Sequence, residues 1–362
     1  MKKSLLATTA LAALGAVAVA GPATAAEKIK VSVGGYMEQW FGYADSKNNV
    51  QADADGFDQQ SDGEIFFKGS TTLDNGIKVG INVQLEGQSE DQFNRNGGDQ
   101  IDEQFAYIEG SFGRVIIGSE NAATYLMHYG IPSHGAGIDS GDVSSWIANV
   151  DFTAHTTNGR GPDNDAEKIT YFTPRFSGFQ LGASYTPEVE QDVDGFRVNR
   201  GAAGTLNKEN NGVRDDAFSV AANFNRAFGD VKVKASAGYS DFGDDDAVVG
   251  DQESYQFALH LGFGGFGVAG TYGENDRAPG STMETIGVGL NYAAGPFGVS
   301  LGYIGAENDD IDDEQDAFEL GMKYKLGPGV EARGSVFYAE REVAGVETAE
   351  GFAVIGGLKL GF

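Results

Sequence analysis

The sequence has no cysteine, few prolines and few basic residues. Without cysteine, disulfides and thiolate metal sites are excluded. With 8 prolines against 24 phenylalanines and 14 tyrosines, the composition is not that of a disordered or low-complexity chain. Lysine and arginine together number 25, against 53 aspartates and glutamates, which gives a net charge of −28. Nucleic acid is therefore an unsuitable partner, because its binding requires a basic face.

Long apolar runs are also rare, and after residue 25 none reaches the roughly 18 residues that indicate a transmembrane helix. The N-terminus has two lysines, an uncharged run to Ala20, a helix-breaking Gly21-Pro22 and the small-x-small sequence Ala23-Thr24-Ala25. This is the layout of a secretory signal peptide, which we expect at 1–25, with cleavage after Ala26 as the alternative. A membrane anchor is disfavoured because the helix breaker and the cleavage site directly follow the apolar run.

What the sequence does contain is alternation of apolar and polar residues with a period of two. The C-terminal segment shows one apolar face, made of Phe352, Val354, Gly356, Leu358, Leu360 and Phe362. The opposite face is small or charged, with Ile355 as the exception. The same alternation recurs at 77–86, 217–224, 231–239, 255–263 and 318–326. Period two predicts amphipathic β-strands throughout.

The connections between these segments alternate between short and long. Short turns rich in glycine are predicted at 74–76, 112–113, 176–178, 228–230, 264–265, 294–296 and 327–329. Long polar connections are predicted at 44–63, 88–100, 119–166, 187–216, 241–253, 273–283, 305–316 and 340–351. Seven short and eight long connections join sixteen strands. The first strand (about 28–43) and the last (352–362) are expected to pair.

This arrangement predicts an all-β chain whose residues 26–362 form a sixteen-stranded antiparallel transmembrane β-barrel. A soluble β-sandwich also shows alternation, but it would not sort its connections so regularly into short and long. The polar face, rich in Gly, Ser and Thr with scattered charges, suits a wet lumen. Lipid offers no partner to backbone polar groups, so the sheet must close. A barrel of this size is too wide for side chains to fill.

Three stretches resemble the general porins of Gram-negative bacteria, most closely those of alphaproteobacteria. They run from Glu64 to Val79, from Ala106 to Gly118 and from Ile169 to Gln180. The resemblance implies a trimeric diffusion channel in the outer membrane that contacts lipid and lipopolysaccharide and passes small hydrophilic solutes and ions. The terminal Phe362 is similar to the family's signal for barrel assembly. The acidic loops depart from the family pattern, so selectivity is not implied.

In the resembled family the third loop folds into the lumen and narrows it, with an acidic loop facing basic residues across the pore. A structureless connection as long as 119–166 is usually functional. We therefore expect a constriction formed by Asp139, Asp142, Asp151, Asp163 and Asp165 facing lumen bases among Lys30, Lys68, Arg333 and Arg341. The alternative is a solvated surface loop whose charges face water.

Two other long connections are densely acidic. One contains Asp309, Asp310, Asp312 and Asp313, and the other contains Asp244 and Asp245. Like charges this dense repel one another unless cations collect there. Calcium accepts irregular oxygen ligands, so calcium bridging is one hypothesis and a solvated run of charge is the other. Either way the potential at the mouth concentrates cations, which predicts cation selectivity.

The sequence shows no catalytic or required cofactor site. Three of the four histidines, His128, His134 and His155, lie in the longest connection without the spacing of a metal site, although they would make conductance pH-sensitive. Gly262-x-Gly264-x-x-Gly267 matches a dinucleotide pattern but reads as a hairpin, since no helix follows. The prediction is a general diffusion porin without enzyme activity. The alternatives are a solute-specific porin and a non-channel anchor or adhesin.

Overall fold

The computed structural model describes residues 28–48, 54–87, 101–140, 142–150, 161–189, 214–243, 252–276 and 282–362. The predicted signal peptide therefore lies outside the described residues, as do Asp151, His155, Asp244 and Asp245. No helix in the described part of the chain is long and apolar enough to cross a membrane.

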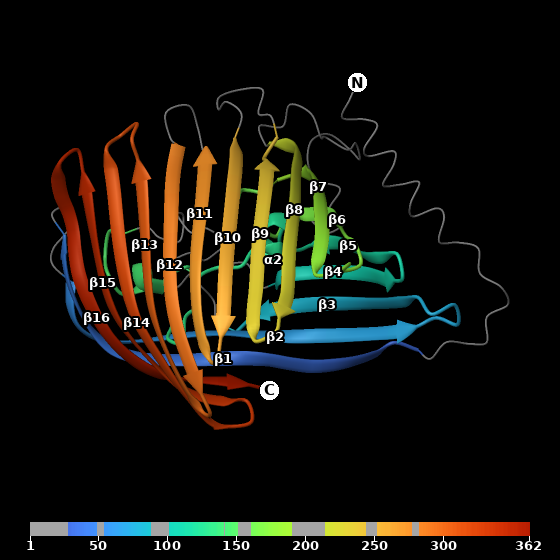
Figure 1. Cartoon of the computed structure of the whole chain (residues 1–362), viewed down its shortest axis with the longest axis horizontal. Coiled ribbons are helices and arrows are strands. Elements are labelled where there is room, and N and C mark those ends of the chain that lie inside the picture. The colour runs from blue at the N-terminus through green and yellow to red at the C-terminus, as the bar shows by residue number, and fades with distance from the viewer. Residues whose placement is uncertain are drawn as a thin grey trace, which may run out of the picture.

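The described residues form a closed antiparallel barrel of sixteen strands, as the alternation predicted (Figure 1). Two short helices, α2 (Ala123–Met127) and the 3-10 helix η2 (Asp142–Ser145), lie between β5 and β6. The strands are β1 (Lys30–Asn48), β2 (Ala54–Thr72), β3 (Lys78–Glu86), β4 (Ile101–Gly110), β5 (Gly113–Ser119), β6 (Glu167–Phe172), β7 (Phe179–Glu188), β8 (Asp215–Phe228), β9 (Val231–Asp241), β10 (Glu253–Phe263), β11 (Phe266–Asp276), β12 (Thr282–Ala294), β13 (Phe297–Asn308), β14 (Asp313–Gly327), β15 (Val330–Val343) and β16 (Val346–Gly361).

The barrel closes where the first and last strands meet. β1 pairs with β16 from Tyr36 opposite Gly361 to Asn48 opposite Ala349, as expected. The terminal Phe362 continues this seam: its N–H donates to the Gly35 carbonyl over 3.1 Å, and its carbonyl accepts from the Gly35 N–H over 3.0 Å. Closure leaves no unpaired sheet edge, which is the condition for strands in lipid.

All seven short turns lie where they were predicted. The turn between β10 and β11 is typical, because Gly264 and Gly265 have φ values of 56° and 89°. Two consecutive residues in the left-handed region define the turn that matches the twist of a two-residue hairpin. These turns mark one end of the barrel, called here the short-turn end, and the longer connections mark the long-loop end.

The long connections are shorter than predicted, most clearly in three places. The interval 340–351 is mostly strand, with a tight turn at Ala344-Gly345, where φ is 53° and 73°. Much of 305–316 and of 44–63 is also strand. The strands extend beyond their apolar belt at the long-loop end, where both faces of a strand are polar. Alternation, the signal used to recognise a strand, is lost there.

The two faces of the wall differ in chemistry. Along β10, Phe257, Leu259 and Leu261 are exposed, whereas Gln256 and Ala258 are buried. We call the face of Gln256 and Ala258 the inner face and the apolar face the outward face. An apolar outward face and a polar inner face are the arrangement of a transmembrane barrel.

Near the long-loop end, carboxylates replace apolar residues on the outward face. They stand opposite one another on neighbouring strands: Glu274 faces Glu284, Glu284 faces Glu307, and Glu307 faces Glu314. Like charges directly opposite each other across a sheet repel. The rim of the barrel is therefore strongly negative over β11–β14.

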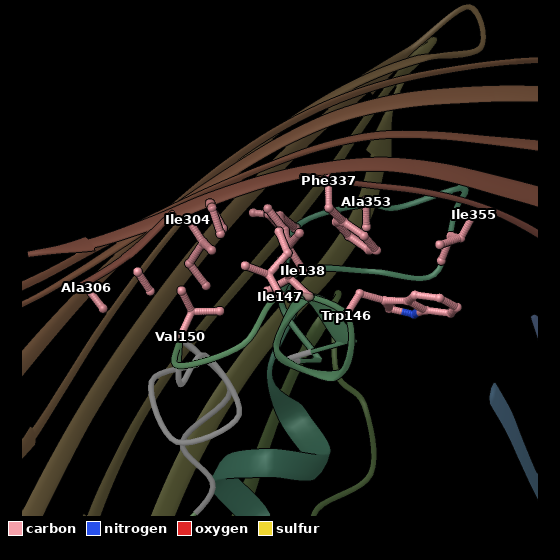
Figure 2. Packing of buried hydrophobic residues seen from close by; sticks show 14 of the residues in the cluster. Ile138, Trp146, Ile147, Val150, Ile304, Ala306, Phe337, Ala353 and Ile355 are labelled. Atoms are coloured by element: carbon pink, nitrogen blue, oxygen red, sulfur yellow. The ribbon is translucent and has the colours of Figure 1, made fainter. Parts of the chain in front are cut away.

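A hydrophobic cluster fills part of the barrel interior (Figure 2). It joins the connection between β5 and β6 to the inner face of the wall, and we call it the inner core. Ile355, the exception in the predicted polar face, belongs to it. Its buried members are Trp40, Ile131, Ile138, Val143, Trp146, Ile147, Val150, Ala269, Met283, Ile304, Ala306, Ala317, Phe337, Ala339, Ala349, Ala353 and Ile355.

Candidate functional site

The connection between β5 and β6, residues 120–166, is called here the long loop. Its first part packs α2 against the inner face of β7, β8 and β9 (Figure 1). The Ala123 N–H donates to Ser184 Oγ over 2.8 Å, and the Tyr129 N–H donates to Ser236 Oγ over 3.2 Å. Small hydroxyl side chains on the wall thus satisfy the loop backbone and allow it to approach closely.

The next part of the long loop, residues 131–140, is held by a glutamate on β14. The Glu319 carboxylate is almost fully buried and accepts hydrogen bonds from Ser133 Oγ over 2.8 Å and from the Gly137 N–H over 3.1 Å. The Ser335 hydroxyl on β15 donates to the same carboxylate over 2.7 Å and accepts from the Ala136 N–H over 2.8 Å. A buried carboxylate with several donors makes strong, charge-assisted hydrogen bonds.

The third described part, residues 142–150, reaches β1, a strand of the seam, and the neighbouring β2. The Ala148 N–H donates to Ser46 Oγ on β1 over 3.0 Å, and Gln60 Nε2 on β2 donates to the Ser145 carbonyl over 2.6 Å. The first part of the loop contacts β9 and this part contacts β1. The loop therefore touches inner-face residues of strands on different sides of the closed barrel. The inner core anchors the same stretch through Trp146, which Figure 2 shows among the clustered side chains.

The acidic residues of the long loop have different surroundings. Asp163 and Asp165 lie at the foot of the loop, and each side chain is almost fully buried, at 2% exposed. Burial raises the pKa of Asp163, while Lys168 and Thr186 lower it. The Lys168 ammonium also donates to the Ala166 carbonyl over 2.6 Å.

Two acids lie in the middle of the loop. The Asp139 carboxylate accepts from the Ile131 N–H over 2.9 Å. Burial raises the pKa of Asp142 to about 7, although its hydrogen bond from the Ser140 hydroxyl lowers it. Asp142 therefore changes charge within the physiological range of pH.

The predicted lumen bases separate into two pairs. Arg333 donates to Glu331 over 2.8 Å and to the Gly135 carbonyl of the loop over 3.4 Å. Arg341 likewise contacts the Asn149 carbonyl of the loop over 3.3 Å. Both arginines thus meet the loop backbone.

The other two predicted bases are lysines on exposed parts of the wall. Lys68 is exposed on β2 with its ammonium 4.0 Å from the centre of the Phe66 ring. Lys30 is exposed at the short-turn end, opposite Ser70.

Two histidines of the long loop lie within the described residues. Burial lowers the pKa of His128 to about 4, with Asp139 opposing this shift and His260 adding to it. Burial also lowers the pKa of His134, as do the nearby Lys323 and Arg333. Both imidazoles are therefore neutral near pH 7.

The predicted calcium ligands of the outer turn are only partly available. Asp309, Asp310 and Asp312 lie in the turn between β13 and β14, and Asp310 accepts from the Thr282 N–H over 3.3 Å. Asp313 instead forms a two-pronged ion pair with Arg341, over 2.8 and 2.7 Å. The calcium hypothesis for this turn therefore concerns the first three aspartates.

Sequence reasoning missed two groups on the inner face. One is Glu319, whose place on the polar phase of β14 was visible but whose loop partners were not. The other comprises Glu64 on β2 with Asp102 and Glu103 on β4, which each offer one ligand atom within 4.8 Å of the others. The adjacent acids Asp102 and Glu103 interrupt the period of two, and this was the available signal.

A serine motif on β13 has no catalytic context. Gly298-Val299-Ser300-Leu301-Gly302 fits the Gly-x-Ser-x-Gly pattern of hydrolases, which requires a sharp turn from strand to helix. Here all five residues lie within β13, and Ser300 Oγ accepts from the His134 backbone N–H over 2.8 Å. Ser300 therefore serves to dock the loop.

Comparison with solved structures gives the same architecture. An anion-selective porin from Comamonas acidovorans has a TM-score of 0.60 at 14% identity, covering 92% of this chain and 100% of that one. A loop-deletion mutant of OmpT, an outer membrane protein of Vibrio cholerae, has a TM-score of 0.59 at 13% identity, with coverages of 93% and 100%. A mutant of the Rh. blastica porin has a TM-score of 0.57 at 18% identity, with coverages of 92% and 100%. These likenesses concern the fold.

Among curated proteins, none matches the sequence. The family model described as Gram-negative porin matches residues 7–343, which is nearly the whole chain. Together with the closed barrel of sixteen strands, this match shows that the chain belongs to the Gram-negative porin family and is an outer-membrane porin.

Proposed function

We propose that the chain forms a water-filled pore, narrowed by the long loop, through which small hydrophilic solutes and ions diffuse passively. The observation that carries this proposal is the docking of residues 123–140 and 142–150 on the inner face between β7 and β2. A loop fixed by both hydrogen bonds and an apolar core reduces the open cross-section by a constant amount. Sixteen strands leave space for water beside it.

The charge balance supports a preference for cations. On the inner face Arg333, Arg341 and Lys359 each contact a carboxylate, so their charges are offset. Asp62 is exposed on β2, and the rim over β11–β14 is negative. A negative mouth raises the local concentration of cations. The anion selectivity of the Comamonas porin belongs to a protein with 14% identity and does not bear on these residues.

Planar-bilayer recordings test both parts of the proposal. We expect a large conductance that does not saturate with salt, and a reversal potential in a KCl gradient that shows cation preference. Asp62→Asn should reduce this preference, whereas Asp230→Asn, in the short turn between β8 and β9, is the matched control. Anion preference in the wild-type channel would refute the selectivity, and absence of conductance would refute the pore.

A solute-specific porin is the second candidate, and the inner aromatics argue against it. A sugar channel needs a ladder of exposed rings. Trp40 is 6% exposed and Phe337 is 0% exposed, because both pack in the inner core. Tyr36 and Phe66 remain partly accessible, with ring centres 6.2 Å apart. A single pair of rings does not form a ladder. This candidate would be favoured over general diffusion only if one sugar blocked the current at low concentration.

The family resemblance also supports a homotrimer in contact with outer-membrane lipid and lipopolysaccharide. Chemical cross-linking of the detergent-solubilised protein should stop at three chains. A calcium ion at Asp309, Asp310 and Asp312 remains a second part of the proposal. Asn substitutions at Asp309 and Asp310 should then lower the calcium stoichiometry.

A further inference from the structure

Three carboxylates from two strands meet on the inner face beside the start of the long loop. They belong to Glu64 on β2 and to Asp102 and Glu103 on β4, and one ligand oxygen from each lies within 4.8 Å of the others. Tyr36 on β1 donates its hydroxyl to Glu64 over 2.9 Å. Acidic groups this close repel strongly, so their convergence requires a cause.

A β-bulge brings the two adjacent acids of β4 together. In the pairing of β3 with β4, Val83 faces Gln104 and Leu85 faces Ile101, so β4 has one residue more than β3 between these pairs. Asp102 and Glu103 occupy the bulge. Regular strands point consecutive side chains to opposite faces, and a bulge changes the direction of one of them. The bulge thus lets both carboxylates approach Glu64.

Glu103 is buried with an unsatisfied oxygen. The residue is 7% exposed, and its Oε1 accepts from Asn121 Nδ2 over 2.9 Å. Within the described residues, Glu103 Oε2 has no hydrogen-bond donor, and neither has Oδ1 of Asn121, a residue that is 8% exposed. A buried carboxylate oxygen without a donor is costly, and a cation would satisfy it.

The surrounding charges leave this negative potential largely uncompensated. Glu103 is repelled by Glu120, Asp102, Asp165 and Glu64. The nearby Lys168 is buried, and its ammonium donates to the carbonyls of Glu120 and Ala166. The bases Lys68, near Glu64, and Arg114 and Lys168, near Glu120, are therefore outnumbered by the carboxylates around them.

We propose that Glu64, Asp102 and Glu103 form a binding site for one calcium ion at the root of the long loop. All three ligand groups are carboxylates. Asn121 Oδ1 is a nearby neutral oxygen that accepts no hydrogen bond from the described residues. Calcium takes six to eight oxygens in irregular geometry, as a bulge provides, whereas magnesium requires a near-ideal octahedron. Zinc prefers nitrogen and sulfur donors, which this group lacks.

The ion would hold the loop at its origin. Asn121 is the second residue of the loop, and its amide is bonded to Glu103. Calcium at Glu103 would therefore fix the junction between β5 and α2 against β2 and β4. This role is separate from conduction, because a pore without calcium would still conduct and a calcium site could exist in a barrel that does not.

Terbium luminescence with the purified full chain in detergent tests the site. Tyr36 lies next to Glu64, so exciting tyrosine should sensitise a bound terbium ion. We expect saturable emission that calcium displaces, and at least tenfold weaker calcium binding in Glu103→Gln. Tyr36→Phe should dim the emission while calcium binding, measured by equilibrium dialysis, stays within twofold. The control Asp309→Asn/Asp310→Asn should leave the sensitised emission intact.

Two outcomes would overturn the site. One is loss of the sensitised emission in the Asp309→Asn/Asp310→Asn control, which would place the ion at the outer turn. The other is calcium affinity in Glu103→Gln equal to that of the wild type. If Glu103→Gln does not fold, Asp102→Asn provides the same comparison, and unchanged affinity there refutes the proposal. Bilayer conductance of the same samples reports separately on the pore.

Discussion

Replacing Phe337 by alanine should release the long loop without opening the barrel. The Phe337 side chain on β15 is 0% exposed and belongs to the inner core that joins the wall to Trp146 and Ile147. Truncating a buried phenylalanine costs about 3–5 kcal/mol. The strand ladder does not depend on this side chain, so the cost falls on loop docking. The docked population should therefore drop by about two to four powers of ten relative to the undocked one.

Single-channel noise and proteolysis measure this change. Phe337→Ala should show larger current fluctuations and faster cleavage within residues 120–150, with heat-modifiable mobility of the barrel preserved. Phe257→Ala is the matched control, because it deletes a ring on the outward face of β10, which faces away from the loop. Equal noise and equal cleavage in the two variants would refute the inference that the inner core holds the loop.

Three further predictions concern single residues. Glu319→Gln should weaken docking by about 1–3 kcal/mol, because the amide loses the negative charge and one of the two oxygens that accept from Ser133 and Gly137, and cleavage of the loop by protease should accelerate. Because burial raises the pKa of Asp142 from 3.8 to about 7, its contribution to docking is full below pH 3.8 and is lost as pH rises through 7. Wild-type current noise should therefore grow from pH 4 to pH 7, and a similar growth in Asp142→Asn would contradict the assignment. Deleting Phe362 should reduce the yield of assembled barrel, because both hydrogen bonds to Gly35 are lost, while Phe362→Tyr should assemble normally in a heat-modifiability assay.

The barrel could be predicted because its determinants are local in sequence. The alternation within each strand and the glycine within each short turn directly indicate the number of strands and the pair that closes the barrel. The extent of the strands was not predictable in the same way. Around Ala344-Gly345 both strand faces carry charge, so the hairpin resembled a loop. There the strands are defined by backbone pairing, which does not require any pattern of polar and apolar side chains.

The position of the long loop depends on contacts between residues distant in sequence. Ile355 on the polar phase and Phe337 among the inner aromatics were visible as irregularities, and both proved to be members of the inner core. Nothing in the sequence paired them with Trp146 or Val150. The prediction also treated every loop aspartate alike, whereas Asp163 and Asp165 are buried at the foot of the loop. Burial is a property of the packed structure and not of the residue type.

The inner core has a consequence for the order of assembly. It contains Trp40 from β1 and both Ala353 and Ile355 from β16, the two strands most distant in sequence. Pairing of such distant segments is slow, because the chain entropy is lost before the contacts form. The apolar residues of the long loop touch both strands from inside. Loop docking and ring closure therefore depend on shared contacts, so each step is expected to stabilise the other.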